Sequence, residues 1–389
     1  MKGRLLKIDL SSRSYSTEDI PSEVLGKYVG GRGLGAYLLY NVVGAGIDPL
    51  GPENCLIFTA GPAQGTNLFF SPKVVLNTKS PLTNIYLYTV SSGTFGHTLR
   101  KAGFCALVIR GMASAPLYLW IDNGEVAFRD AGKLWGMNSY EAQRGMLKDV
   151  SQPKASTLAI GPAGEKLIKY AAVMSDGKLY RAFGRGGAGC VMGAKKLKGI
   201  IIHGDQETDV ADKEGFKQLK RTIRDKLEEK KAWAAERGRY GTGADMIKLN
   251  ELGILPTRNW QGGTFEGVVG ICPATTEDVW PRKNISCGPF CPAPCSHSIE
   301  LDKGPYKGAY CDGPEYETFY AFGSNCGIDK FDAIVAAEQI CDEAGIDTMS
   351  AGLSIGFVME CFEKGLINLK DTDGIELRFG DDQAMIAML

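Results

Sequence analysis

The sequence predicts an α+β fold, in which an N-terminal β domain of two packed sheets (residues 1–207) precedes a mostly helical domain (residues 208–389). Up to residue 207, short runs rich in Val, Ile and Leu alternate with glycine, proline or aspartate, which is typical of strands and turns. After residue 207, apolar residues recur at helical spacing among alternating charges. With 389 residues and 44% apolar content, the chain can bury the cores of about two or three domains.

Short apolar runs predict nine strands in the first domain, at 4–10, 55–61, 73–79, 106–111, 117–122, 125–130, 156–161, 170–176 and 199–205. Helical periodicity predicts helices over 22–43, 139–150, 213–238, 331–345 and 348–365. The helix over 331–345 ends at a C-cap glycine, Gly345. A last helical pattern, 381–389, has no stop signal, so we expect the protein to continue beyond it.

The composition argues against two classes of partner. A formal charge of −1 and a pI near 6.4 give no electrostatic footprint for nucleic acid or for an anionic membrane surface. No run approaches the roughly 18 apolar residues of a membrane span, and the first residues lack the apolar core of a signal peptide. We therefore expect a cytoplasmic protein. Its 11 cysteines, an odd number in a long chain, favour thiols and thiolates over a disulfide framework.

Three cysteines, Cys287, Cys291 and Cys295, lie four residues apart in a proline-broken stretch. Such close spacing directs several sulfurs to one centre, which suits an iron–sulfur cluster or structural zinc. The alternative is that these thiols only pack. Either metal centre needs a fourth ligand, for which the candidates are Cys272, Cys311, Cys326, His297 or a cysteine beyond residue 389.

The stretch YRAFGRGGAGCVMGAKKLKGI (180–200) predicts a phosphate site. Arg181 and Arg185 can each form a fork of hydrogen bonds to phosphate oxygens, and the glycines Gly186, Gly187 and Gly189 let backbone N–H groups approach an anion. The pattern matches neither a P-loop nor a Rossmann fingerprint, so the alternative is a glycine-rich turn between strands. The glycines of VGGRGLGAY (29–37) are better explained by close helix packing.

Acidic residues provide two further candidates. In CDEAGIDTMS (341–350), Asp342 lies in the last turn of one helix and Asp347 can cap the next. The alternative is that these carboxylates accept hydrogen bonds from the amino groups of a pterin or purine ring. In DGPEYET, Glu315 or Glu317 can be buried by its proline and aromatic neighbours, which would raise its pKa toward the range of a general acid or base. The alternative is a solvated glutamate. His97 follows a glycine-containing loop and is a weaker candidate.

Eight stretches carry a family resemblance: AGPAQGT, TKSPLT, SGTFGHTLRKAGFCALVIRG, IGPAGE, RAFGRGGAGCVMGAKKLKGI, CPAPC, GPEYE and CDEAGIDTMSAG. In this order and spacing they resemble the aldehyde:ferredoxin oxidoreductase family of tungsten enzymes. The resemblance implies an N-terminal two-sheet domain that seats a tungsten bis-pyranopterin (tungstopterin), closed over by two helical domains. This chain resembles the first domain and most of the second. In the family, the third supplies a second aspartate-rich pterin motif, the fourth cluster cysteine and a histidine near the metal.

The resemblance also implies roles for individual residues. Expected cofactor contacts are Lys73, Val90, Ser92, Arg181, Ala182, Gly184, Arg185, Asp342, Ile346 and Asp347. Expected ligands of a [4Fe–4S] cluster are Cys287, Cys291 and Cys295, and the expected acid or base is Glu317. Cys287 lies one residue further from Cys291 than in the family, so its loop must bulge. Lys73 replaces an arginine and loses the planar fork. The backbone carbonyl of Val90, where an asparagine is common, is expected to bind the Mg²⁺ that bridges the pterin phosphates.

The implied activity is oxidation of an aldehyde to a carboxylic acid or the reverse, with electrons passing through the cluster to ferredoxin or another iron–sulfur carrier. Two alternatives remain open: an aromatic acyl-CoA reductase-type tungsten subunit, and a cofactor-free scaffold or electron-transfer subunit. Molybdenum can replace tungsten in such a site. We expect the missing domain to come from a separate subunit, unless the chain is truncated, and a homo-oligomer is compatible with the resemblance.

Overall fold

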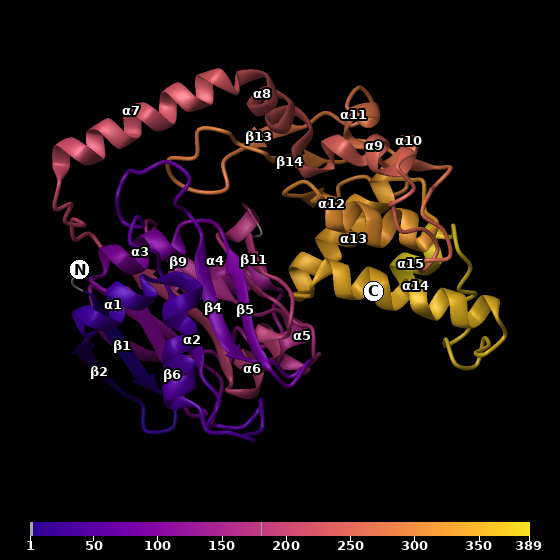
Figure 1. Cartoon of the computed structure of the whole chain (residues 1–389). Helices are drawn as coiled ribbons and strands as arrows, with labels where there is room; N and C mark the ends of the chain where they lie inside the picture. The colour runs from indigo at the N-terminus through magenta and orange to yellow at the C-terminus, as the bar shows by residue number, and fades with distance from the viewer. Residues whose placement is uncertain (1–2, 180) are drawn as a thin grey trace. The chain divides into compact units, whose positions relative to one another are not determined.

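The computed structural model describes residues 3–179 and 181–389, and the chain divides into two compact units (Figure 1). The N-terminal unit contains the described residues up to Glu228 together with two segments from later in the sequence, Cys287–Pro292 and Asp342–Ile346. The C-terminal unit contains Glu229–Ser286, Ala293–Cys341 and Asp347–Leu389. The domain boundary after residue 207 stays a prediction.

The first sheet of the N-terminal unit has six strands in the order β2-β1-β6-β3-β4-β5. Their bounds are β1 (Arg4–Asp9), β2 (Ser14–Asp19), β3 (Leu56–Thr59), β4 (Val74–Lys79), β5 (Tyr86–Ser91) and β6 (Ala106–Arg110). Only β1 and β6 run parallel within this sheet. Two helices, α1 (Ser22–Tyr28) and α2 (Gly31–Val42), pack against one face, because their apolar side chains form a buried cluster with those of β3 and β6.

The second sheet has six strands in the order β11-β10-β9-β12-β7-β8. Their bounds are β7 (Leu117–Asp122), β8 (Glu125–Asp130), β9 (Ser156–Ala159), β10 (Val173–Ser175), β11 (Arg181–Phe183) and β12 (Leu197–His203). The remaining helices of this region are α3 (Phe95–Lys101), α4 (Ser139–Val150), α5 (Pro162–Glu165) and α6 (Ala188–Ala194). Apolar side chains of both sheets, such as Phe58 and Leu119, share one buried core. The predicted α+β fold with two packed sheets is therefore confirmed.

Some predicted elements were wrong in extent. The single helix expected over 22–43 is broken, because Val29 and Gly30 leave helical backbone geometry (φ 63° and 162°) between α1 and α2. The strand β2 was not predicted, since every residue of its sequence SYSTED is exposed and no apolar alternation marks it. Strand β5 and the three-residue β11, inside the glycine-rich stretch, were missed as well.

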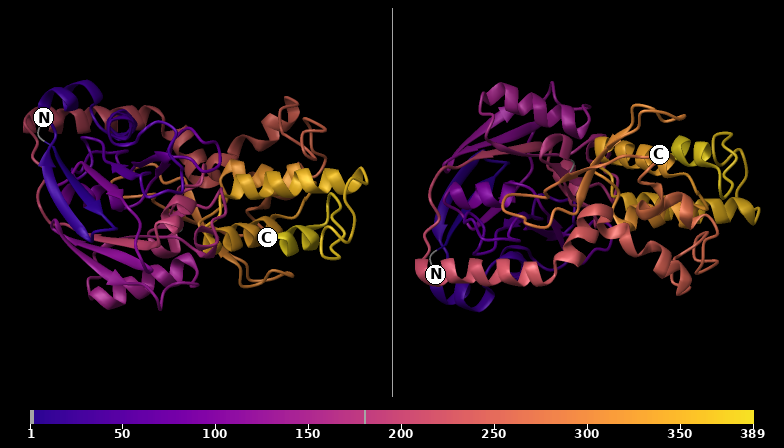
Figure 2. Two further views of the ribbon diagram at one scale, coloured as in Figure 1. Left: turned by 90° about the horizontal axis from the view of Figure 1, so that it is seen from below. Right: turned by 90° about the horizontal axis from the view of Figure 1, so that it is seen from above.

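The helix expected over 213–238 is also two helices, α7 (Lys213–Glu229) and α8 (Lys231–Tyr240), of which α7 belongs to the N-terminal unit up to Glu228. The other helices of at least four residues in the C-terminal unit are α9 (Met246–Glu251), α10 (Val268–Ile271), α11 (Pro273–Thr276), α13 (Phe331–Ala344, up to Cys341), α14 (Thr348–Glu363) and α15 (Asp382–Met388). Figure 2 shows α14 as a long, straight helix in yellow.

Three short strands, β13 (Lys283–Ile285), β14 (Ser296–Glu300) and β15 (Tyr310–Cys311), form an antiparallel sheet that was not predicted. The cysteine stretch is the connection between β13 and β14. A short helix, α12 (Tyr316–Thr318), follows and continues into a wider turn, Phe319–Gly323. Among the described residues, no helix is both long enough and apolar enough to cross a membrane.

Candidate functional site

The predicted phosphate-binding residues begin on strand β11. Arg181 pairs with Ser175 of β10, whose hydroxyl also donates to the Arg181 carbonyl oxygen at 3.2 Å. This pairing fixes the backbone of Arg181, whose side chain is buried, with 8% of the residue exposed. Ala182 and Gly184 are half-buried, and Arg185 is exposed. Burying a guanidinium costs folding free energy unless charged or polar groups surround it. Of these residues, Arg181 is therefore the strongest candidate for binding an anion.

The acidic helix junction, Asp342–Ile346, lies in the same compact unit as these arginines. Ala172 N–H donates to the Gly345 carbonyl at 2.8 Å, and Ala171 forms an isolated antiparallel bridge with Ile346. From the other side, Gly189 N–H donates to the Ala171 carbonyl at 2.9 Å. The segment that leads into β10 is therefore contacted both by the junction and by the glycine stretch that follows the arginines.

Two distant residues position the junction. Ser139, the first residue of α4, donates its hydroxyl hydrogen to the Asp342 carbonyl at 2.7 Å. Gly161 approaches so closely that an added Cβ would lie 2.3 Å from the Ala344 carbonyl oxygen. Sequence reasoning missed both residues, because they are far from the junction in sequence and belong to no chemical motif. The glycine of the IGPAGE stretch was the available signal for Gly161.

Asp347 caps helix α14, as one of the two interpretations predicted. Its carboxylate accepts hydrogen bonds from the Ser350 N–H at 2.9 Å and from the Ser350 hydroxyl at 2.6 Å. The residue is buried, with 7% exposed. Capping is thus confirmed, while a role of Asp347 in cofactor binding stays a prediction.

Substitutions at Asp347 separate these roles. We expect Asp347→Ala to lower the free energy of unfolding by about 1 kcal/mol, because the N-cap acceptor is lost. Asp347→Ser keeps a capping oxygen and should retain most of that stability, but it removes the carboxylate. If the carboxylate also binds the cofactor, tungsten per protein falls in both variants. Urea unfolding measures the stability and metal analysis measures the tungsten content. If Asp347→Ser binds as much tungsten per protein as the wild type, the carboxylate has no binding role.

Two glycines of the predicted phosphate loop serve backbone packing instead. A Cβ on Gly187, which has φ +84°, would lie 2.1 Å from the Lys169 carbonyl oxygen, and one on Gly189 would lie 2.2 Å from that of Ala172. The Gly189 N–H already donates to the Ala171 carbonyl, so it does not point at an anion. The prediction that the backbone N–H of Gly189 approaches phosphate was therefore wrong, while the roles of Arg181 and Arg185 at a phosphate stay predictions.

The loop after β5 connects the predicted pterin contacts to the cysteine stretch. Val90 is exposed and Ser92 is buried. The next residue, Gly93, donates its N–H to the Cys287 carbonyl at 2.6 Å. A candidate cofactor loop and a candidate cluster ligand are thus joined by one backbone hydrogen bond, within the N-terminal unit.

Asp176 holds this loop in place, and sequence reasoning missed it. Its carboxylate accepts hydrogen bonds from the Thr94 N–H at 3.1 Å and from the Thr94 hydroxyl at 2.6 Å. Burial raises the pKa of Asp176 above its usual value, and these hydrogen bonds oppose that shift. The turn sequence MSDG, with Asp176 in left-handed geometry (φ 58°), was the available signal.

The cysteine stretch favours a thiolate at Cys287. The pKa of Cys287 is lowered to about 6, chiefly by a hydrogen bond from Cys291. The positive charges of Lys73 and Arg181 lower it further, while burial of the thiol opposes the shift. Cys295 immediately precedes β14. Among residues 3–179 and 181–389, however, no three His, Cys, Asp or Glu side chains lie close enough together to share one metal ion.

Two candidates for the fourth cluster ligand are engaged elsewhere. The buried Cys326 thiol donates to the Ala321 carbonyl, and burial raises its pKa to about 12, so it is a poor source of thiolate. The Nε2 of His297 lies 2.8 Å from the Gly238 carbonyl oxygen and donates to it, which occupies that nitrogen. Cys272 and Cys311 are buried.

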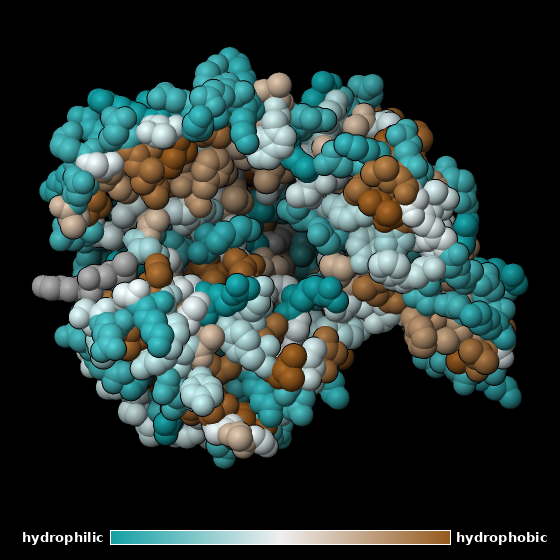
Figure 3. All heavy atoms as spheres, in the orientation of Figure 1, coloured by the Kyte–Doolittle hydropathy of each residue, from teal (hydrophilic) through white to brown (hydrophobic). Residues whose placement is uncertain are grey.

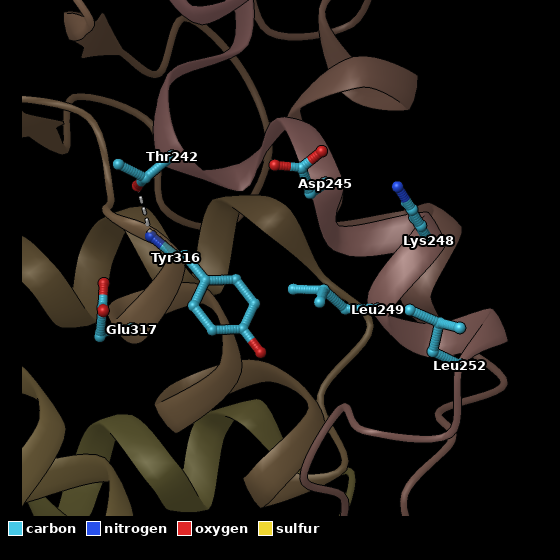
Figure 4. A pocket seen from close by; sticks show the side chains of 7 residues that line it. All are labelled: Thr242, Asp245, Lys248, Leu249, Leu252, Tyr316 and Glu317. Atoms are coloured by element: carbon cyan, nitrogen blue, oxygen red, sulfur yellow. Dashed lines mark hydrogen bonds between the residues drawn. The ribbon is translucent and has the colours of Figure 1, made fainter.

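Glu317 lines a cavity of about 520 Å³ in the C-terminal unit (Figure 4). Its other lining residues are Thr242, Asp245, Lys248, Leu249, Leu252 and Tyr316. Both Glu315 and Glu317 are exposed, so the expectation that one of them is buried was wrong. The reason is that Tyr316 turns its ring into the cavity, while the Glu315 carboxylate accepts a hydrogen bond from the Thr242 hydroxyl at 2.6 Å.

Comparisons with known proteins identify the family. The model of the aldehyde ferredoxin oxidoreductase N-terminal domain matches residues 5–204, and that of its domains 2 and 3 matches residues 218–389. A tungsten-containing aldehyde ferredoxin oxidoreductase of Thermococcus kodakarensis is 37% identical over 98% of this chain and 62% of its own length. The WOR-like subunit of an aliphatic sulfonate oxidoreductase of Pyrococcus furiosus is 34% identical over 100% of this chain and 63% of its own length.

A solved structure is similar over the whole chain. The active-site complex BamBC of benzoyl coenzyme A reductase, with 1,5-dienoyl-CoA, aligns with a TM-score of 0.84 and 25% sequence identity, covering 100% of this chain and 60% of that chain. The chain thus spans less than two thirds of the length of the relatives that it matches. Since two family models together cover most of its residues, the chain belongs to the aldehyde ferredoxin oxidoreductase family.

Proposed function

We propose that this chain is the cofactor-binding part of a tungsten–pterin oxidoreductase that oxidises an aldehyde to a carboxylic acid and passes the electrons to ferredoxin. One observation carries the proposal: Lys73 and Arg181, both expected at pterin phosphates, also lower the pKa of Cys287, an expected cluster ligand. These three residues belong to the N-terminal unit. Positive charge of this kind favours both a phosphorylated cofactor and a thiolate that can bind a cluster.

The donor chemistry fits these groups. The buried Arg181 guanidinium offers a planar fork to a phosphate, and the exposed Arg185 and Lys73 add charge. Asp342 is a buried carboxylate at the helix junction, suited to accept hydrogen bonds from ring amino groups. The thiolate character of Cys287, next to Cys291, suits iron ligation.

We assign the residues as follows. Lys73, Arg181 and Arg185 bind the pterin phosphates, and Asp342 and Asp347 accept hydrogen bonds from the ring. Ser92, Ala182, Gly184 and Ile346 line the rings, and the Val90 carbonyl binds Mg²⁺. Cys287, Cys291 and Cys295 hold a [4Fe–4S] cluster. When bound, the tungstopterin supplies two-electron redox chemistry and the cluster single-electron transfer.

Glu317 is assigned the proton transfer. Oxidation of an aldehyde with water to a carboxylic acid releases two electrons and two protons, so an exposed carboxylate beside a cavity can accept a proton from water and release it to solvent. Tyr316, Leu249 and Leu252 line the same cavity and give it a partly apolar wall, against which a small aldehyde can pack.

Arg181 tests the cofactor assignment. We expect Arg181→Ala to lower tungsten per protein at least about tenfold, because a buried bidentate phosphate contact is worth about 1.5–3 kcal/mol. Arg181→Lys should recover only part of the binding, since lysine lacks the planar fork. Metal analysis with pterin extraction measures the loss, and Arg129→Ala, which removes a half-buried guanidinium on β8 that pairs with Asp149, is the control. Unchanged tungsten in Arg181→Ala would contradict the assignment.

A second candidate function is reduction of an aromatic acyl-CoA, favoured by the likeness to the benzoyl coenzyme A reductase complex. Parallel assays with aldehydes and with benzoyl-CoA discriminate the two. A sample without tungsten, molybdenum and pterin would instead support a scaffold, and one with iron and sulfide alone would support an electron-transfer subunit. We also propose a cytoplasmic location and assembly into a homo-oligomer.

A further inference from the structure

Helix α7 carries a stripe of basic residues that have no role in the proposed cofactor or cluster site. Its members, Lys217, Lys220, Arg221 and Arg224, follow the spacing i, i+3, i+4, i+7 and therefore share one face of the helix. Together with Asn67 and Phe216 they line a surface cavity of about 370 Å³. Lys217, Arg221 and Arg224 are exposed. In the described part of the chain none of the four forms an ion pair, so these cations are available to a partner of opposite charge.

The stripe adjoins the cysteine stretch within the N-terminal unit. A second cavity, of about 320 Å³, shares Asn67 and Phe216 with the first and is also lined by His97 and Phe290. The rings of His97 and Phe290 lie 5.9 Å apart, centroid to centroid. Phe290 directly precedes Cys291, so a molecule bound over the two cavities would lie beside the candidate cluster ligands.

Phe290 has the features of an interface anchor. It is 45% exposed, and its backbone adopts the left-handed region (φ 60°), which is unfavourable for a bulky residue. His97, the other aromatic residue there, accepts a hydrogen bond at Nδ1 from the Gly65 N–H at 3.2 Å, and burial lowers its pKa, so it contributes a neutral ring. An exposed aromatic side chain beside a charged rim is the usual composition of a protein–protein interface.

We propose that the basic stripe of α7 and Phe290 form the docking surface for an acidic iron–sulfur electron carrier. The inference rests on the proposed function, because it takes the cysteine stretch as the exit for electrons. Charge complementarity supports this partner: an acidic protein is attracted to a face whose lysines and arginines form no ion pair, and that attraction accelerates association without burying the charges. Among the described residues that line the second cavity, Glu207 is the one acidic residue, and Lys101 lines it as well.

The surface around α7 combines polar and apolar residues, as a protein-binding surface does. Figure 3 shows mostly hydrophilic spheres over α7 with a group of hydrophobic spheres beside them. Leu219 on this helix is 46% exposed. The cation of Lys220 lies 5.5 Å from the centre of the Phe69 ring, so the helix is held to the loop that borders both cavities.

The test is a charge reversal in the purified, metal-loaded protein. The variant Lys217→Glu/Arg221→Glu/Arg224→Glu is compared with Lys133→Glu/Lys148→Glu/Lys154→Glu, which reverses three exposed lysines on α4 and its flanking loops and touches neither cavity. The probe is an acidic bacterial-type [4Fe–4S] ferredoxin, whose binding is measured by biolayer interferometry at low and at near-physiological ionic strength. Circular dichroism and tungsten content check that each variant is folded and loaded.

We expect wild-type affinity to fall as salt rises, because exposed charges are screened beyond about 8 Å at physiological ionic strength. The α7 variant should bind at least about tenfold more weakly at low salt and lose most of the salt dependence, while the α4 variant stays within about twofold of wild type. Dye-linked aldehyde oxidation should be unchanged in both variants.

Equal ferredoxin affinity in the α7 variant and wild type, or no binding by wild type, would overturn the proposal. Displacement of the ferredoxin by an equimolar single-stranded RNA would instead assign the stripe to nucleic acid. These results are distinguishable from failure of the proposed function. A protein without tungsten or cluster would refute that function, while binding of the ferredoxin to the same sample would still report on the α7 surface.

Discussion

Replacing Glu165 with alanine is expected to lower the free energy of unfolding of the N-terminal unit by about 3–5 kcal/mol, because it leaves a buried ammonium without its counter-charge. The side chain of Lys198, on β12, is 0% exposed, and that of Glu165, on α5, is 7% exposed. Burial lowers the pKa of Lys198, and the hydrogen bond to Glu165 opposes that shift. The Glu165 carboxylate also accepts a hydrogen bond from the exposed Gly136 N–H at 2.8 Å, so its loss removes the partner of one buried and one exposed donor.

Urea unfolding of Glu165→Ala, with a midpoint shift at constant slope, measures this loss. Glu165→Gln keeps acceptor oxygen and removes the charge, so it should lie between wild type and alanine. The double variant Glu165→Gln/Lys198→Met should recover much of the stability, because neither charge remains buried alone. A loss below about 1 kcal/mol in Glu165→Ala would show that water reaches Lys198 and that the pair behaves as a surface ion pair.

Replacing Gly93 with alanine is expected to remove most of the bound tungsten and iron as well as destabilise the fold. Gly93 has φ +94°, and an added Cβ would lie 1.6 Å from the Asp176 carboxylate. Backbone strain alone costs about 1–3 kcal/mol. In addition, Asp176 must move, which breaks its hydrogen bonds to Thr94 and shifts the Gly93 N–H away from the Cys287 carbonyl.

Gly136→Ala is the matched control for Gly93→Ala. Gly136 has a similar φ of +90°, but a Cβ there meets no atom within 4 Å. The strain should therefore be comparable, and the difference between the variants isolates the displacement of Asp176. Metal analysis and urea unfolding on both proteins decide the matter. Equal tungsten and iron in the two variants would mean that the Gly93 loop does not support the cofactor site.

The elements that could be predicted are those that a local sequence pattern specifies, and the missed ones depend on residues distant in the sequence. Strands β7 and β8 and helix α4 occur at their predicted residues, because local alternation and a local cap specify them; Asn138, for example, caps α4 by accepting from the Glu141 N–H at 2.8 Å. By contrast, β2 has no buried face, and its pairing with β1 depends on the partner strand rather than on its own residues.

The residues of the candidate site also fall into those that a local pattern predicts and those that depend on distant contacts. Arginines, aspartates and cysteines are found from residue type and spacing, and the family resemblance orders them. Asp176 and Ser139 act only through the contacts they make, with Thr94 and with the Asp342 carbonyl, and no local pattern encodes such partners. The packing role of Gly189 was hidden for the same reason, since its constraint comes from the Ala172 carbonyl.

The two late segments within the N-terminal unit, Cys287–Pro292 and Asp342–Ile346, have a consequence for biosynthesis. A ribosome must translate past residue 346 before this unit has all of its chain. Until then Ala172 lacks its partner at Gly345, and Gly93 lacks its partner at Cys287. The shared core of the two sheets uses residues 6–202 alone, so what comes late is the cofactor region, whose exposed loops are open to aggregation, chaperone binding and cofactor insertion until synthesis passes residue 346.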